Sequence, residues 1–210
     1  MNSVETKPFR GDRPARTTDT RPRSKVPHGV FILDRSGSMR EHWSNAREAW
    51  ATFVSEQQAL KEPFNLTLIL FDYEYTVAFA KVSIGAVQPE AIETYGPRGS
   101  TALLDTLGRA MNEHPDDTMF VIFTDGLENA SKEFNVKQIR EMVTERKTKG
   151  SEFQFLSQNL DAIDMGRALG TQAQFYSDHD TLFTAGTKKA SASTRSFRGH
   201  YADSSSKESA

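Results

Sequence analysis

Short apolar runs alternate with amphipathic stretches along most of the chain. Two runs, residues 28–34 and 118–126, are almost continuously apolar until they end on a carboxylate, which is typical of central parallel strands covered on both faces. Residues 64–73 and 75–84 are β-rich and nearly contiguous, and this spacing predicts an antiparallel hairpin. Further strands are predicted at residues 152–158 and 172–177.

Apolar residues recur at helical spacing between these strands. Helices are predicted at residues 42–60, 102–114, 135–150 and 161–170, with a short helical turn at 88–95 and a further helix at 181–197. Pro63 ends the first helix, and Gly150 and Gly170 end two of the later ones. Strands alternating with helices predict an α/β fold, a doubly wound and mostly parallel sheet with helices on both faces.

The flanks differ in composition from the rest of the chain. We expect one domain over residues 26–189, a disordered basic N-terminal arm over residues 1–25, and a flexible Ser-rich tail over residues 190–210. The N-terminus lacks the apolar stretch of a secretory signal, no run is long enough to cross a membrane, and cysteine is absent. These features predict a soluble, cytoplasmic protein.

The formal net charge of −2 hides an uneven distribution. Residues 1–29 carry 7 Lys and Arg against 3 Asp and Glu, whereas residues 30–184 carry 14 basic and 23 acidic residues. An acidic centre suits cation binding. The basic arm could contact nucleic acid through phosphates, but it lacks interleaved aromatic residues for base stacking, so nucleic acid is not the expected partner.

Five oxygen-bearing side chains fall where ligands of open α/β sheets bind, beyond the carboxyl ends of strands. Asp34, Ser36 and Ser38 follow the first apolar run, Thr101 precedes a predicted helix, and Asp125 follows the second run. If the two runs are adjacent central strands, these side chains converge on one pocket. The sequence therefore predicts a single site built from the five.

The chemistry of this set suits a hard cation, because every donor is oxygen. Mg²⁺ is favoured, with Mn²⁺ and Ca²⁺ as alternatives. Alternate spacing lets the three side chains of the first loop face one point, and Gly37 between the serines permits the bend. The two carboxylates are the only charged ligands, and the hydroxyls are neutral. The ion therefore remains a good Lewis acid, with room for one outside anion.

These residues resemble the metal-ion-dependent adhesion site (MIDAS) of the von Willebrand factor type A domain. The family pattern is Asp-x-Ser-x-Ser after the first strand, a later Thr and a later Asp, and all its positions are filled here in order, over about residues 30–177. The resemblance implies a doubly wound sheet with one antiparallel edge strand, here residues 75–84. It also implies that a Glu or Asp of a partner protein completes the metal's coordination.

Simpler explanations exist for each residue. The Asp-x-Ser-x-Ser loop and Thr101 could cap the helices that follow, and Asp125 could close a turn with the next glycine; a degenerate site that keeps the fold without metal is a third alternative. Three further acidic residues could orient water or hydroxyl groups near the ion or line its rim, although turn or helix-surface roles would also account for them. They are Asp72, Asp105 and Glu128.

Two function classes fit a cation at this position. The preferred one is a Mg²⁺-dependent protein-binding module that recognises an acidic side chain of a partner, in the assembly or regulation of an intracellular complex. The alternative is a hydrolase or phosphotransferase that uses the same ion. A catalyst would need a base or activated nucleophile, and ordinarily more carboxylates, whereas Ser36 and Ser38 would serve as ligands. We therefore expect no enzymatic activity.

Overall fold

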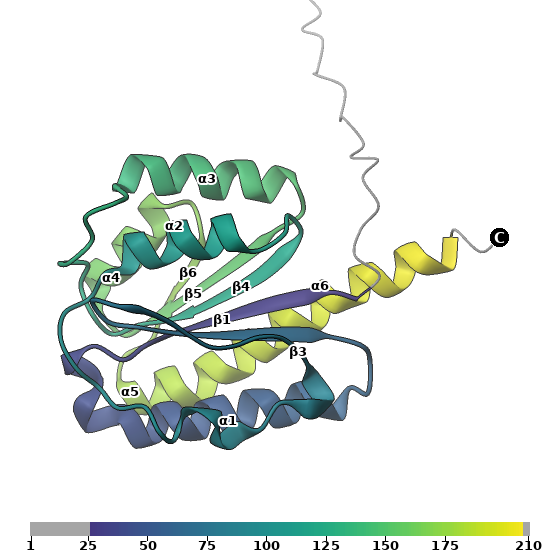
Figure 1. The fold of residues 1–210 in the computed structure, drawn as a ribbon, viewed down its shortest axis with the longest axis horizontal. Coiled ribbons are helices and arrows are strands. Elements are labelled where there is room, and N and C mark those ends of the chain that lie inside the picture. Colours follow the sequence, from purple (N-terminus) through teal and green to yellow (C-terminus); the bar gives the residue numbers. More distant parts are fainter. Residues whose placement is uncertain (1–25, 208–210) are drawn as a thin grey trace, which may run out of the picture.

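The computed structural model describes the backbone of residues 26–207 and the side chains of all of these except 179 and 202–207. Its centre is a six-stranded sheet in the order β3-β2-β1-β4-β5-β6 (Figure 1). The strands are β1 (His28–Asp34), β2 (Asn65–Phe71), β3 (Tyr75–Ser83), β4 (Thr118–Phe123), β5 (Glu152–Ser157) and β6 (Gln172–Phe175). Only β3 is antiparallel to its neighbour, so the predicted fold class, including the antiparallel edge strand, is confirmed.

Helices cover both faces of the sheet (Figure 1). One face carries α2 (Leu103–Glu113), α3 (Val136–Thr148) and α4 (Leu160–Ala168). The other carries α1 (Trp43–Ala59), α5 (His179–Thr181), the π-helical turn η4 (Leu182–Gly186) and α6 (Thr187–Lys207). Short 3₁₀ turns lie in the connections, namely η1 (Gly37–His42), η2 (Ile84–Ala86) and η3 (Pro89–Ile92). No helix within residues 26–207 is long and apolar enough to cross a membrane.

The continuous apolar run of β1 reflects this double cover. Phe31 and Leu33 belong to the core cluster on the α1 and α6 face, where the ring of Phe31 stacks on Phe123 at 5.2 Å between centroids. Val30 and Ile32 belong to the cluster under α2, α3 and α4. Because successive side chains of a strand point to opposite faces, both sets must be apolar.

Strand β1 pairs with β2 on one side and with β4 on the other, so the order of the strands reverses at β1. Asp34, the last residue of β1, is opposite Phe71, and Leu33 is opposite Phe123. The carboxyl ends of three parallel strands therefore meet at the switch point where connections leave in opposite directions. This is the position at which such sheets form a crevice.

The C-terminal segment differs from the expected flexible tail, because α6 continues to Lys207 and packs on the domain. Ala190, Thr194, Phe197 and Tyr201 are buried at helical spacing, a pattern that the surrounding Ser and Lys residues obscured. The buried guanidinium of Arg198 donates to backbone and side-chain oxygens at the end of α1 and just beyond it. Residues 1–25, the predicted basic arm, and residues 208–210 lie outside the described part of the chain.

Candidate metal site

The five predicted ligands lie together at the carboxyl edge of the sheet. Asp34 ends β1 and is fully buried, Ser36 and Ser38 follow in the turn that opens η1, and Asp125 lies two residues after β4. Thr101 ends the loop that leads into α2 and is also buried. We call the side chains of these five residues the oxygen cluster.

Hydrogen bonds connect most of the oxygen cluster. The backbone N–H of Ser36 donates to Asp34 Oδ1 at 2.6 Å, which fixes the carboxylate at the strand end. Ser38 Oγ donates to Asp125 Oδ1 at 2.7 Å and lies 3.1 Å from Ser36 Oγ. The loop after β1 is thereby joined to the loop after β4 through side-chain oxygens.

Oxygens of three of these residues pack against Gly126. A Cβ atom added to Gly126 would lie 2.7 Å from Thr101 Oγ1, 3.0 Å from Asp34 Oδ2 and 3.1 Å from Ser36 Oγ. The oxygens come from three separate segments and point at nearly the same place. Together with the hydrogen bonds through Ser38, these distances show that the fold gathers all five side chains.

The donor set fits a hard divalent cation. Two carboxylates and three hydroxyls supply only oxygen, the ligand type that Mg²⁺, Mn²⁺ and Ca²⁺ prefer. Among the described residues, no group of three or more His, Cys, Asp or Glu side chains is placed so that it could hold a metal ion. A cation at this edge would therefore depend on hydroxyl ligands as well as on carboxylates.

The electrostatics at Asp34 also favour a cation. The pKa of Asp34 is raised from 3.8 to about 6, chiefly by burial and to a smaller extent by the nearby charge of Asp125, while hydrogen bonds from Thr124 and Ser36 act in the opposite direction. Burial disfavours a bare carboxylate, and a neighbouring positive charge favours it. A bound divalent ion would stabilise both carboxylates in their charged form.

Asp72 is completely buried but does not belong to the oxygen cluster. Its carboxylate lies 3.1 Å from Arg35 Nε and 2.8 Å from Arg98 Nε, and its backbone carbonyl accepts from Ala102 N. Arg35 and Arg98 are also joined directly, since Arg98 N donates to Arg35 O at 2.8 Å. Asp72 thus ties the loop after β1 to the loop that carries Thr101.

Asp105 and Glu128 shape the loops around the site through backbone N–H groups. The Asp105 carboxylate accepts from the backbone of residues 132–134. Glu128 accepts from Leu104 N at the start of α2 and from two N–H groups of its own loop. Both side chains serve loop and helix geometry, and neither has a hydrogen bond to the oxygen cluster among those the structure gives for them.

Sequence reasoning did not single out Thr124 and Gly126. Thr124 Oγ1 donates to Asp34 Oδ2 at 2.5 Å and accepts from Gly126 N at 3.1 Å, so it orients the buried carboxylate from β4. The Thr-Asp-Gly tripeptide was the available signal for both residues. Asn129 has a related role, because its Oδ1 accepts from Thr101 N at 2.9 Å.

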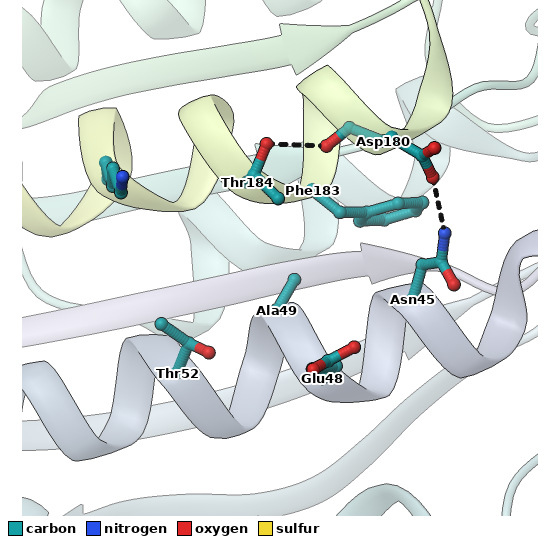
Figure 2. A pocket seen from close by; sticks show the side chains of 8 residues that line it. Asn45, Glu48, Ala49, Thr52, Asp180, Phe183 and Thr184 are labelled. Atoms are coloured by element: carbon teal, nitrogen blue, oxygen red, sulfur yellow. Dashed lines mark hydrogen bonds between the residues drawn. The ribbon is translucent and has the colours of Figure 1, made fainter.

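A cavity of about 450 Å³ lies elsewhere, between α1 and the α5–η4–α6 segment. Figure 2 shows Asn45 reaching across it to Asp180, with Nδ2 donating to Oδ1 at 2.9 Å. The cavity is lined by Asn45, Glu48, Ala49, Thr52, Asp180, Phe183, Thr184 and Lys188. It shares no residue with the oxygen cluster and lies within the helical layer of α1 and α6, so it is a separate feature.

Comparison with solved structures identifies the architecture, whereas no family model and no curated protein matches the chain. A von Willebrand factor type A protein from Catenulispora acidiphila superposes with a TM-score of 0.56 at 16% identity, over 79% of this chain and 42% of that one. The pilus adhesin SpaC from Lactobacillus rhamnosus GG gives a TM-score of 0.63 at 16% identity, over 84% and 31%.

Proximal thread matrix protein 1 of the mussel byssus, solved with a zinc-occupied MIDAS motif, gives a TM-score of 0.56 at 15% identity, over 79% of this chain and 45% of that one. This chain spans less than half the length of each of the three proteins. At such identities the likeness concerns the fold. The six-stranded sheet, its single antiparallel edge and its two helical layers are those of a von Willebrand factor type A domain.

Proposed function

We propose that the oxygen cluster binds Mg²⁺ and that the chain is a protein-binding module that recognises an acidic side chain of a partner protein through this ion. The observation that carries the proposal is the convergence of oxygens of Asp34, Ser36 and Thr101, which lie within about 3 Å of one point beside Gly126. Mn²⁺ and Ca²⁺ accept the same donors and are alternative ions.

The chain's own residues have distinct roles in this proposal. Asp34, fixed by Ser36 N and Thr124 Oγ1, supplies charge at the buried end of the site. Thr101 is held through its backbone carbonyl, which accepts from Asn129 N and Ala130 N in the loop after β4. Ser38 is exposed and donates to Asp125, so these two residues form the side of the site that faces solvent. A bound cation would supply a positive charge able to accept an oxygen ligand from outside the chain.

Binding is proposed in preference to hydrolysis or phosphoryl transfer. Both serine hydroxyls are assigned as ligands, and two carboxylates are few for a catalytic centre that must hold an ion and activate a nucleophile. Proteins of similar fold include a pilus adhesin and a thread matrix protein of the mussel byssus, and the second was solved with zinc in its MIDAS. We propose a cytoplasmic setting, which the absence of cysteine favours.

Affinity capture from the native host lysate tests this function. The wild-type chain should retain a protein in Mg²⁺ and release it in EDTA, whereas Asp34→Ala and Asp125→Ala should retain none although circular dichroism shows them folded. Asp164→Ala removes an exposed carboxylate on α4 and serves as the control that keeps capture. Undiminished capture in EDTA would refute the role of the ion.

A further inference from the structure

Exposed apolar side chains gather around the oxygen cluster. Among the described residues, five large apolar side chains are well exposed: Tyr73, Val77, Leu127, Leu160 and Phe175. Tyr73, Leu127 and Leu160, with exposed fractions of 51%, 44% and 61%, follow the carboxyl ends of β2, β4 and β5. We call these three residues the apolar row.

The sheet order places the oxygen cluster within this row. Tyr73 follows β2 and Leu127 follows β4, and these strands flank β1, which ends on Asp34. Leu160 follows β5, one strand beyond Leu127. Since neighbouring strands are about 4.8 Å apart, the three segments span roughly 14 Å along the edge of the sheet. The site therefore has an aromatic side chain on one side and aliphatic side chains on the other.

Tyr73 and Leu127 both lie next to the oxygen cluster. A Cβ on Gly99 would lie 2.3 Å from the Tyr73 ring, so the ring covers Gly99, whose carbonyl accepts from Gly37 N at 3.0 Å. Tyr73 is thus one contact away from the loop that holds both serines. Leu127 directly follows Gly126, the residue beside the convergent oxygens.

The charge beside Tyr73 is already neutralised. The Arg98 guanidinium lies 5.2 Å from the centre of the Tyr73 ring and is paired with the carboxylates of Asp72 and Glu74. This end of the row therefore presents an aromatic surface without an uncompensated cation. It suits an apolar side chain of a partner better than a second acidic one.

From this arrangement we propose that the partner presents its acidic residue in an extended segment, with apolar residues two positions before and two positions after it. The inference rests on the proposed function. In an extended strand, residues at i and i±2 point to the same side and are about 7 Å apart. With the Asp or Glu at the cation, the two apolar side chains reach Tyr73 on one side and Leu127 with Leu160 on the other.

Three synthetic peptides test the proposal by calorimetric titration in Mg²⁺. They are Ac-Ser-Leu-Ser-Asp-Ser-Leu-Ser-NH₂, the same peptide with serine in place of both leucines, and the same peptide with asparagine in place of aspartate. We expect the leucine peptide to bind at least tenfold more tightly than the serine peptide, and the asparagine peptide not to bind. Tyr73→Ser and Leu127→Ser should weaken binding of the leucine peptide at least fivefold.

Val77→Ser is the matched control, because Val77 is 41% exposed on β3 and lies outside the row. It should bind the peptide and Mg²⁺ as the wild type does, and the two row variants should retain wild-type Mg²⁺ affinity. Equal affinity for the leucine and serine peptides, an equal loss in Val77→Ser, or no peptide binding by Mg²⁺-loaded protein would overturn the inference alone. Failure of the wild type to bind Mg²⁺ would overturn the proposed function together with it.

Discussion

Replacing Gly126 by alanine tests the oxygen cluster with one methyl group. The new Cβ would lie 2.7 Å from Thr101 Oγ1, closer than real Cβ atoms come to their neighbours, and about 3 Å from two more oxygens, which is tighter than most such contacts. Gly126 is not among the residues with positive φ, so alanine adds no backbone strain of that kind. The substitution therefore acts by forcing these oxygens apart.

The expected loss is large for so small a change. Overpacking of this kind costs about 1–3 kcal/mol of stability. Because the oxygens must also move apart, we expect Mg²⁺ affinity to fall at least 100-fold, which corresponds to about 2.8 kcal/mol. Isothermal titration calorimetry measures the affinity, and urea denaturation followed by circular dichroism measures the stability.

Gly85→Ala is the control for this experiment. A Cβ at Gly85 meets nothing within 4 Å, so this variant should bind Mg²⁺ with wild-type affinity. If Gly126→Ala folds and binds Mg²⁺ as tightly as Gly85→Ala does, then the convergent oxygens are not the cation site, and the reasoning from their geometry is wrong.

Three further predictions concern charge and pH. Asp72→Asn removes the carboxylate between two arginines, one of them buried, and should cost about 3–5 kcal/mol in urea denaturation, while weakening Mg²⁺ binding less than Asp34→Asn does. Burial lowers the pKa of both His28 and His114 from 6.5 to about 4. The free energy of unfolding in EDTA should therefore be greatest above pH 6.5 and fall by roughly 3 kcal/mol per histidine toward pH 4. The raised pKa of Asp34 partly offsets this fall. A flat stability profile over that range would contradict it. Because protons compete with the cation for Asp34, Mg²⁺ affinity should fall as pH drops below about 6, by up to about tenfold per unit, and calorimetry at pH 5, 6 and 7 measures this.

The central strands and the five side chains of the oxygen cluster were predictable because their signals are local. The run from His28 to Asp34 is apolar on both faces, and only a strand with two covered faces requires this. Asp34, Ser36 and Ser38 alternate within one loop, and Asp125 ends a second apolar run. Adjacency of β1 and β4, which brings them together, follows from the general rule for open α/β sheets.

Other features depend on contacts between distant segments. The role of Asp72 rests on Arg35 and Arg98, which only the folded loops bring to its carboxylate. The oxygens converge beside Gly126 only because the fold places Thr101 next to it. A helix was expected only to residue 197 and a flexible tail over residues 190–210, because serines surround the buried positions of α6. The bonds of Arg198 to the end of α1, which hold this helix on the domain, join segments far apart in the sequence.

Anomalous diffraction from crystals grown in MnCl₂ tests the central claim most directly. Mn²⁺ accepts the same oxygen ligands as Mg²⁺ and can be located by its own scattering. The account predicts a single strong peak at the carboxyl edge of the sheet, within about 2.0–2.6 Å of oxygens of the oxygen cluster or of waters that they hold. An ordered cluster without a peak, or Mn²⁺ bound only at other carboxylates, would contradict it.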